Sequence, residues 1–157
     1  MTNLERMIAL AEEVFHTKND PGQIAINDET MDRLLRIHPS TMSERKDENG
    51  PVAWTIVLPT TFVVMERFVS GSITERELLE ETPLSGPYDA LYLCSALVLP
   101  EARRKGYARS LLEESIRTIA RTYPMRSLFS WPFSPEGDAL ADAVARDMGL
   151  PMLKRLV

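Results

Sequence analysis

The chain has 157 residues, which at roughly 150 residues per domain predicts a single domain over residues 1–157. Its 18 Lys and Arg against 23 Asp and Glu give a net charge of −5, so we expect no nucleic-acid partner. The single cysteine excludes an internal disulfide, and the two histidines share no ligand spacing, so we expect no metal site.

The first part of the chain is predicted to be mainly helical. Apolar residues recur at three- and four-residue spacing over residues 3–17, which indicates an amphipathic helix that the polar residues 19–22 end. A short strand is expected at 23–27. A second helix is predicted over 28–38, because the residue before Pro39 avoids the α region.

The next stretch mixes loop, strand and helix signals. Residues 39–50 are polar and close with Asn-Gly, so we expect an exposed loop. A β-rich run at 52–58 predicts a strand that Pro59 stops. Residues 60–70 fit a strand by composition and a helix by their apolar stripe. We favour the helix, because a capping box at 74–77 opens another short helix.

The second half of the chain alternates strands and helices. The nearly continuous apolar run at 91–99 predicts a strand covered on both faces, hence a central one. A long helix over about 106–122, a strand at 126–131 and a helix over 134–148 follow, with a last short strand within 151–157. These elements predict a mixed α/β fold.

The join between the apolar strand and the long helix carries the clearest chemical signal. A loop that enters a helix presents backbone N–H groups without intrahelical partners, which favours an anion such as a pyrophosphate. Arg103, Arg104 and Lys105 add positive charge there, and Gly106 allows a close backbone approach. A solvated basic helix start is the alternative interpretation of these four residues.

The stretch Arg103-Arg104-Lys105-Gly106-Tyr107-Ala108 resembles motif A of the GNAT superfamily of acyl-CoA-dependent N-acyltransferases. In that motif a hydrophobic strand is followed by Arg or Gln, two residues, Gly, one residue, and Gly or Ala. The resemblance implies a GNAT-like central twisted mixed sheet flanked by helices. It also implies that residues 91–150 bind acyl-CoA and that residues 1–90 form a variable acceptor side.

The resemblance further implies roles for individual residues. Backbone amides from Arg104 to Ala108 would hold the pyrophosphate of coenzyme A, with Arg103 at the first position of the motif. Main-chain groups of Leu97, Val98 and Leu99 would pair with the pantetheine arm as an added strand would. In the second family motif, Asp138 falls on the asparagine position. Ala145 replaces the tyrosine that often protonates the leaving thiolate, which leaves the acid unassigned.

Direct transfer needs a neutral amine, so a group must accept a proton. Tyr92 stands where some relatives place a glutamate base, and Cys94, two residues on, is an alternative nucleophile. Both residues also fit a packing role. Glu66, and the acidic run that comprises Glu75, Glu77, Glu80 and Glu81, fit either an acceptor cleft or a solvated helix face.

The sequence therefore predicts an N-acyltransferase that uses acetyl-CoA or another acyl-CoA as co-substrate. The acceptor would be a small-molecule or peptide amine that attacks directly in a ternary complex. Alternatives are a non-catalytic acyl-CoA binding or sensing module, a plain interaction domain, and a nucleotide-binding α/β protein.

The lengths of the apolar runs bear on the cellular location of the protein. None approaches the ~20 residues of a membrane helix, and the first residues lack the apolar core of a secretory signal. We therefore expect a cytoplasmic protein without a membrane partner. A homodimer is compatible with the sequence, which does not determine the oligomeric state.

Overall fold

The computed structural model describes residues 1–15, 21–25 and 27–156, the side chain of Phe15 excepted. The predicted residues 16–17 of the first helix and the turn residues 19–20 lie outside this range. Five strands form one sheet in the order β1-β2-β3-β4-β5. The strands are β1 (Met42–Asp47), β2 (Gly50–Thr60), β3 (Ala90–Val98), β4 (Ser127–Ser130) and β5 (Met152–Lys154). The helices are α1 (Asn3–Phe15), α2 (Asp28–Ile37), α3 (Phe62–Val69), α4 (Glu75–Glu81), α5 (Tyr107–Thr122) and α6 (Pro135–Met148), with a 3₁₀ turn η1 (Pro100–Ala102) before α5.

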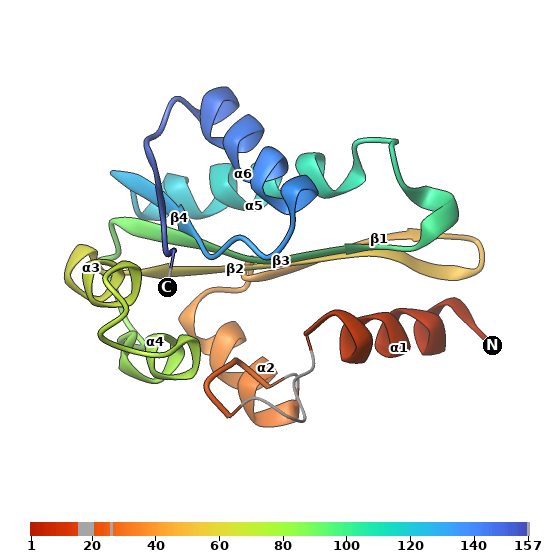
Figure 1. Ribbon diagram of the computed structural model, residues 1–157, viewed down its shortest axis with the longest axis horizontal. Helices are drawn as coiled ribbons and strands as arrows, with labels where there is room; N and C mark the ends of the chain where they lie inside the picture. The colour runs from red at the N-terminus through yellow and green to blue at the C-terminus, as the bar shows by residue number, and fades with distance from the viewer. Residues whose placement is uncertain (16–20, 26, 157) are drawn as a thin grey trace.

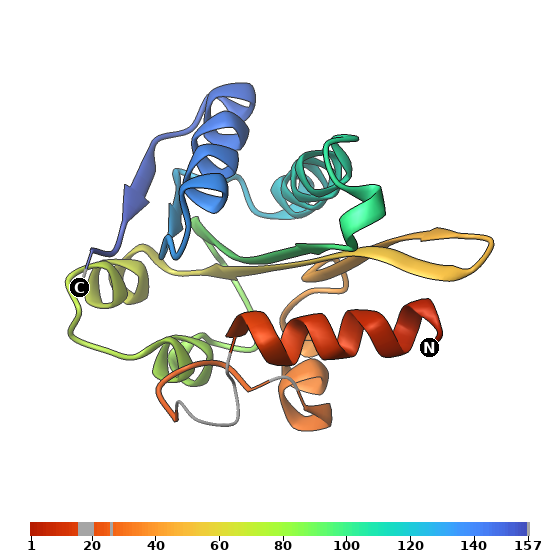
Figure 2. The same cartoon turned by 45° about the vertical axis from the view of Figure 1, so that its right-hand side comes forward.

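The sheet is mixed and lies between two helical layers. β1, β2 and β3 pair antiparallel, whereas β3, β4 and β5 pair parallel. α1, α2 and α4 cover one face and α5 and α6 cover the other, with α3 at one end (Figures 1 and 2). Along β3, Tyr92 packs into the first layer and Leu93 into the second. The prediction of a central strand covered on both faces is therefore confirmed.

Local capping chemistry sets the starts of five helices, and at α1 the hydroxyl of Thr2 accepts from the N–H of Glu5. Asn27, Thr61, Thr74 and Ser134 each accept a hydrogen bond from a backbone N–H in the first turn of α2, α3, α4 and α6. At α4, Thr74 and Glu77 form the complete capping box that the sequence predicts. The helix favoured over 60–70 is confirmed as α3, and the helices expected over 28–38, 106–122 and 134–148 are confirmed as α2, α5 and α6.

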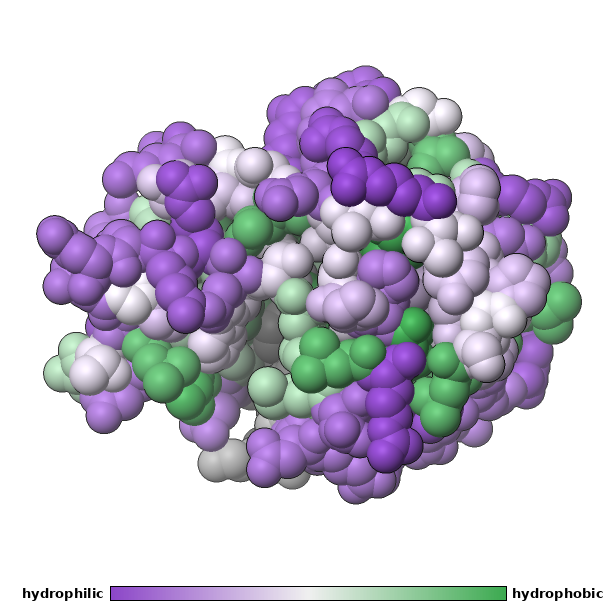
Figure 3. Space-filling view, turned by 180° about the vertical axis from the view of Figure 1, so that it is seen from behind, coloured by the Kyte–Doolittle hydropathy of each residue, from purple (hydrophilic) through white to green (hydrophobic). Residues whose placement is uncertain are grey.

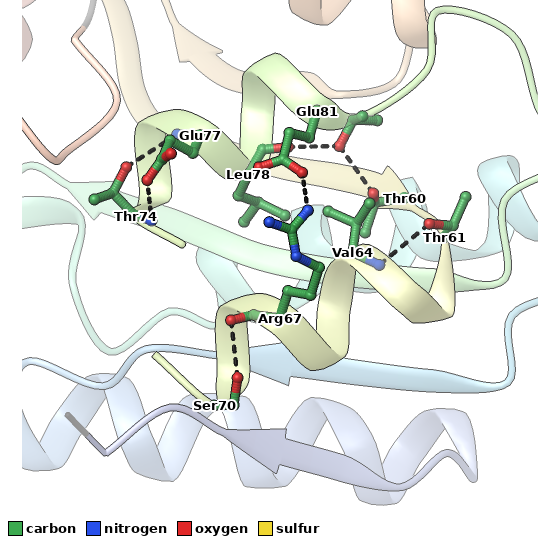
Figure 4. A network of polar contacts seen from close by, with 10 residues as sticks. Thr60, Thr61, Val64, Arg67, Ser70, Thr74, Glu77, Leu78 and Glu81 are labelled. Atoms are coloured by element: carbon green, nitrogen blue, oxygen red, sulfur yellow. Dashed lines mark hydrogen bonds and ion pairs between the residues drawn. The ribbon is translucent and has the colours of Figure 1, made fainter. Parts of the chain in front are cut away.

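The two short helices α3 and α4 form a unit inserted between β2 and β3, and polar contacts hold it to the end of β2 (Figure 4). The hydroxyls of Thr60 and Thr82 lie 2.8 Å apart, and Thr82 Oγ1 also donates to the carbonyl of Leu78. Arg67 on α3 pairs with Glu81 on α4. These contacts hold α3 and α4 together and to β2, and both helices contribute side chains to the apolar cluster around Tyr92.

The expected strand at 23–27 is wrong, since no strand is found at residues 23–25 or 27. Ile24 instead donates its N–H to Oε1 of Glu75 at 2.9 Å, and Asn27 caps α2. With these groups engaged and no strand alongside, the short segment has no ladder to join.

The expected loop at 39–50 is also wrong, because its middle six residues form the edge strand β1. β1 pairs with β2 from Met42 opposite Ile56 to Asp47 opposite Gly50. Its sequence is charged because four of its six residues are exposed, so the alternation that identifies a strand is missing.

The prediction that Pro59 stops the preceding strand fails by two residues, since β2 ends at Thr60. β2 runs through Pro59, which lies beyond the end of β1, so its missing N–H breaks no bond there.

Candidate functional site

The sheet divides where β3 and β4 stop pairing. Their last paired residues are Leu93 and Ser130, whereas β3 continues to Val98 alongside β2. At the same place β3 carries a bulge, because Ile56 and Val57 of β2 lie opposite Ser95 and Leu93 and leave Cys94 unmatched. We call the opening between the second half of β3 and the chain that follows β4 the fork.

A cavity of about 160 Å³ fills the fork. It is lined from β3 by Leu93, Cys94, Ser95 and Ala96, from the end of β4 and beyond by Ser130, Trp131, Pro132, Phe133 and Ser134, and from the helices by Val14, Leu112, Gly137, Leu140 and Ala141. Most of these side chains are apolar. The face seen in Figure 3 is hollowed near its centre, with hydrophobic surface along the margin of the hollow.

The open edge of β3 offers fewer main-chain groups than expected. The N–H of Leu99 donates to the carbonyl of Val52, and the carbonyl of Leu99 accepts from Ala102, so neither group faces the fork. By alternation along the strand, the main chain of Leu97 faces β2 as well. Val98 faces the fork, and its carbonyl accepts a hydrogen bond from Nε of Arg103 at 3.1 Å.

Alternation also points the main chain of Ala96 towards the fork. The sequence analysis missed this residue, and counting back two positions from Val98 would have found it.

The start of α5 differs from the starts of the five capped helices. Gly106 occupies the N-cap position with φ +78° and has no side-chain cap, and a Cβ built there would meet nothing within 4 Å. Arg104 also has a positive φ of 65°. The first N–H groups of α5 therefore face outward beside three exposed cations, Arg103, Arg104 and Lys105.

Tyr107 and Ala108, the first two residues of α5, are half-buried. The guanidinium of Arg45 on β1 lies 4.5 Å from the ring centroid of Tyr107, which brings a fourth cation to this helix start. Asp138 lies elsewhere. Its carboxylate pairs with Nζ of Lys154 on β5 at 2.6 Å, and Asp138 does not line the cavity.

Tyr92 is fully buried on the paired part of β3, and its hydroxyl donates to Oε2 of Glu75 at 2.6 Å. Burial raises the pKa of Tyr92 well above its ordinary value, and the neighbouring Glu75 carboxylate raises it further. The phenol therefore keeps its proton at neutral pH and acts as a hydrogen-bond donor to Glu75.

Cys94 is half-buried and lines the cavity, on the boundary between the paired and open parts of β3. Burial raises its pKa well above the ordinary value, and Glu75 adds to the shift. Because the thiolate is the reactive form, this environment disfavours a nucleophilic role.

Glu75 fits neither interpretation of the acidic run, because it is buried and lies outside the lining of the cavity. It is only 7% exposed, whereas Glu77 completes the capping box and Glu80 and Glu81 pair with Arg76 and Arg67 on the surface. Its position three and four residues before the buried Leu78 and Leu79 is the signal that places it on the inner face of α4. Glu66 is exposed on α3 and does not line the cavity.

Two further findings concern the described residues alone. They contain no group of three or more His, Cys, Asp and Glu side chains placed to hold a metal ion. None of the helices in this part of the chain has the length and hydropathy needed to cross a membrane.

No protein-family model matches the chain, and no curated protein matches it in sequence. Solved structures resemble it in fold. Naa20 from Chaetomium thermophilum, determined in complex with a bisubstrate analogue, has a TM-score of 0.54 and 17% identity over 91% of this chain and 64% of that one. This chain therefore spans less than two thirds of the length of Naa20.

Two other structures have TM-scores of 0.49. One is the aminoglycoside acetyltransferase meta-AAC0020 from an uncultured soil metagenomic sample, in complex with trehalose, with 15% identity over 92% of this chain and 78% of that one. The other is a presumed acetyltransferase from Agrobacterium tumefaciens strain C58, with 14% identity over 87% of this chain and 83% of that one. The five-stranded mixed sheet with helices on both faces, and its match to Naa20, establish that the chain has the fold of the GNAT acetyltransferases.

Proposed function

We propose that the chain is an N-acyltransferase that transfers an acetyl or related acyl group from acyl-CoA to an amine. The observation that carries the proposal is the fork, where β3 has an open edge next to the uncapped, basic start of α5. Arg103, in the loop before α5, connects the two through its hydrogen bond to the carbonyl of Val98. The residues present fit acyl-CoA in two respects. An open backbone cradle at Gly106 suits a pyrophosphate, and the apolar cavity suits a pantetheine arm and its thioester.

In this proposal the parts of the site divide the work. The N–H groups of residues 104–108 bind the pyrophosphate, with charge from Arg103, Arg104 and Lys105. The main chain of Ala96 and Val98 orients the pantetheine arm along the open edge. Residues 1–90 contribute the acceptor side.

Direct attack by the amine is favoured over an acyl-enzyme. The C–N bond forms as the C–S bond breaks, the sulfur keeps the electron pair, and the proton of the amine passes to solvent. Cys94 is the nucleophile that an acyl-enzyme would need, and the raised pKa of its thiol keeps it protonated. Positioning of the two substrates then supplies most of the rate enhancement.

Calorimetric titration with acetyl-CoA, with ATP as a control ligand, tests the binding half of the proposal. Gly106→Glu should abolish acetyl-CoA binding, because the added carboxylate meets the pyrophosphate at close range. Gly149→Glu is the matched control. Gly149 also has a positive φ, +67°, and open space around a built Cβ, but it ends α6.

Both substitutions place the same side chain in the same strained backbone region, so both should cost similar stability. Equal binding by the Gly106→Glu and Gly149→Glu variants would refute the pyrophosphate assignment. The transfer half is tested by mass spectrometry of a panel of amines incubated with acetyl-CoA. Tight binding without any acetylated amine would contradict it.

A further inference from the structure

A buried hydroxyl without a partner lies in the fork. Ser130 is only 5% exposed, lines the cavity, and its Oγ makes no hydrogen bond within the described part of the chain. Its strand neighbour Leu128 packs between the sheet and helices α5 and α6, which places the Ser130 side chain beside the same helices, on the side of Leu93. A buried hydroxyl that lacks a partner costs stability, which a partner supplied by a ligand would recover.

The position of Ser130 matches the place where charge develops during the proposed transfer. Ser130 is the last residue of β4 that pairs with β3, so it lies at the point where the fork opens. A thioester held along the open edge of β3 ends at this point. As its C–S bond breaks, negative charge appears on sulfur in an apolar cavity, where a hydrogen-bond donor is worth more than in water.

The other groups around the fork are engaged or unsuited. Ser134 is exposed, and its hydroxyl oxygen accepts from Gly137 N–H as the cap of α6, so its O–H donor lies in solvent. The thiol of Cys94 lies on the opposite layer with Tyr92. Ala145 offers no donor and is buried among the apolar residues between α6 and the sheet. Ser95 also lines the cavity, but it is only half-buried.

We infer that Ser130 donates a hydrogen bond to the sulfur of coenzyme A and stabilises the thiolate as it leaves. This inference rests on the proposed function. The C–S bond breaks with its electron pair on sulfur, and Ser130 keeps its proton because an alcohol is a far weaker acid than a thiol. The thiolate takes its proton from water when the product departs.

The test measures the pKa of the bound coenzyme A thiol from the ultraviolet absorbance of the thiolate. Spectra of the protein alone are subtracted, and the raised pKa of Cys94 keeps its thiol out of the working range. Ser130→Ala should raise the pKa of the bound thiol by about one unit or more, since hydrogen bonds to charged groups are the strong ones. Turnover should fall roughly tenfold to a hundredfold.

Two comparisons separate a bond to sulfur from a structural role. Ser130→Ala should bind desulfo-coenzyme A as tightly as the wild type, and its melting temperature should equal or exceed the wild-type value, because no hydrogen bond is lost. Ser127→Ala is the matched control. Ser127 is equally buried on the same strand, but its hydroxyl contacts Sδ of Met65 on the opposite face, so the thiol pKa should not move.

An unchanged thiol pKa in Ser130→Ala, or a shift in Ser95→Ala instead, would overturn the assignment while leaving the proposed function intact. If the wild type binds neither coenzyme A nor desulfo-coenzyme A, the proposed function itself is overturned, and the assignment of Ser130 with it.

Discussion

The two halves of β3 differ in what surrounds them. Over Ala90–Leu93 the strand pairs on both sides, every residue is buried, and Tyr92 is hydrogen-bonded to Glu75. Past the bulge at Cys94 it pairs only with β2, and Cys94, Ser95 and Ala96 line a cavity. One strand thus belongs to the core along its first half and presents an open edge along its second, to which we assign the acyl-CoA. The strand changes from paired on both sides to paired on one side between Leu93 and Cys94.

Tyr92→Phe should have the largest effect on the paired half. The substitution removes a hydrogen bond to a buried carboxylate, so we expect unfolding to become easier by about 1.5–3 kcal/mol. Acetyl-CoA affinity should stay within roughly twofold, since the open half is untouched. Urea denaturation and calorimetric titration of the same preparation check both expectations.

The comparison of the two halves assumes that the phenol of Tyr92 has a structural role, as a hydrogen-bond donor to Glu75 in the core. A variant with wild-type stability but strongly reduced turnover would instead place Tyr92 in the reaction. Combining Tyr92→Phe with Glu75→Gln gives a double-mutant cycle, and the two changes should be strongly non-additive in stability.

Cys94→Ala tests the boundary between the halves. We expect turnover within roughly twofold of the wild type, because the raised pKa of the thiol keeps it protonated and unreactive. Mass spectrometry of the wild type after incubation with acetyl-CoA should find no acylated cysteine. An acetyl adduct on Cys94, together with loss of turnover in the variant, would show that the boundary residue is a nucleophile.

Glu101→Gln, just beyond the open half, should have the smallest effect. Both oxygens of Glu101 accept from Arg6 on α1, and this pair lowers the pKa of Glu101 from 4.5 to about 2. A lowered pKa means that the stabilisation is present above pH 4.5 and is lost as the pH falls towards 2. The small difference in melting temperature between wild type and variant should therefore shrink across that interval, with no change at neutral pH and above.

High salt supplies the control for this pair, because both side chains are solvent-exposed. The difference between wild type and Glu101→Gln should narrow as ionic strength rises. A difference that is independent of both pH and salt would mean that the pair does not fasten α1 to the loop before α5.

Much of the fold could be predicted because its signals are local. Thr74 and Glu77 specify the start of α4, and the spacing of apolar residues along α5 specifies its inner face. β1 could not be predicted, because its partner is non-local and its side chains face solvent. The basic start of α5 was visible in the sequence for the same local reason as the helix caps.

The rest of the candidate site depends on contacts between distant parts of the chain. Glu75 and Tyr92 are 17 residues apart and meet only after α4 folds back over the sheet. Ser130 carries no motif, and its lack of a partner is a property of the folded cavity. Residue types alone could not distinguish these two from ordinary surface and core positions.

The charged strand β1 also affects how the protein behaves at high concentration. It forms one border of the sheet with Glu44, Arg45, Lys46 and Asp47 exposed, and the opposite border, β5, is three residues long. A foreign strand that tried to extend the sheet would have to bury these charges or find too few main-chain partners. The two borders of the sheet therefore protect the chain from strand-by-strand aggregation, while the second half of β3 stays open in the interior of the sheet.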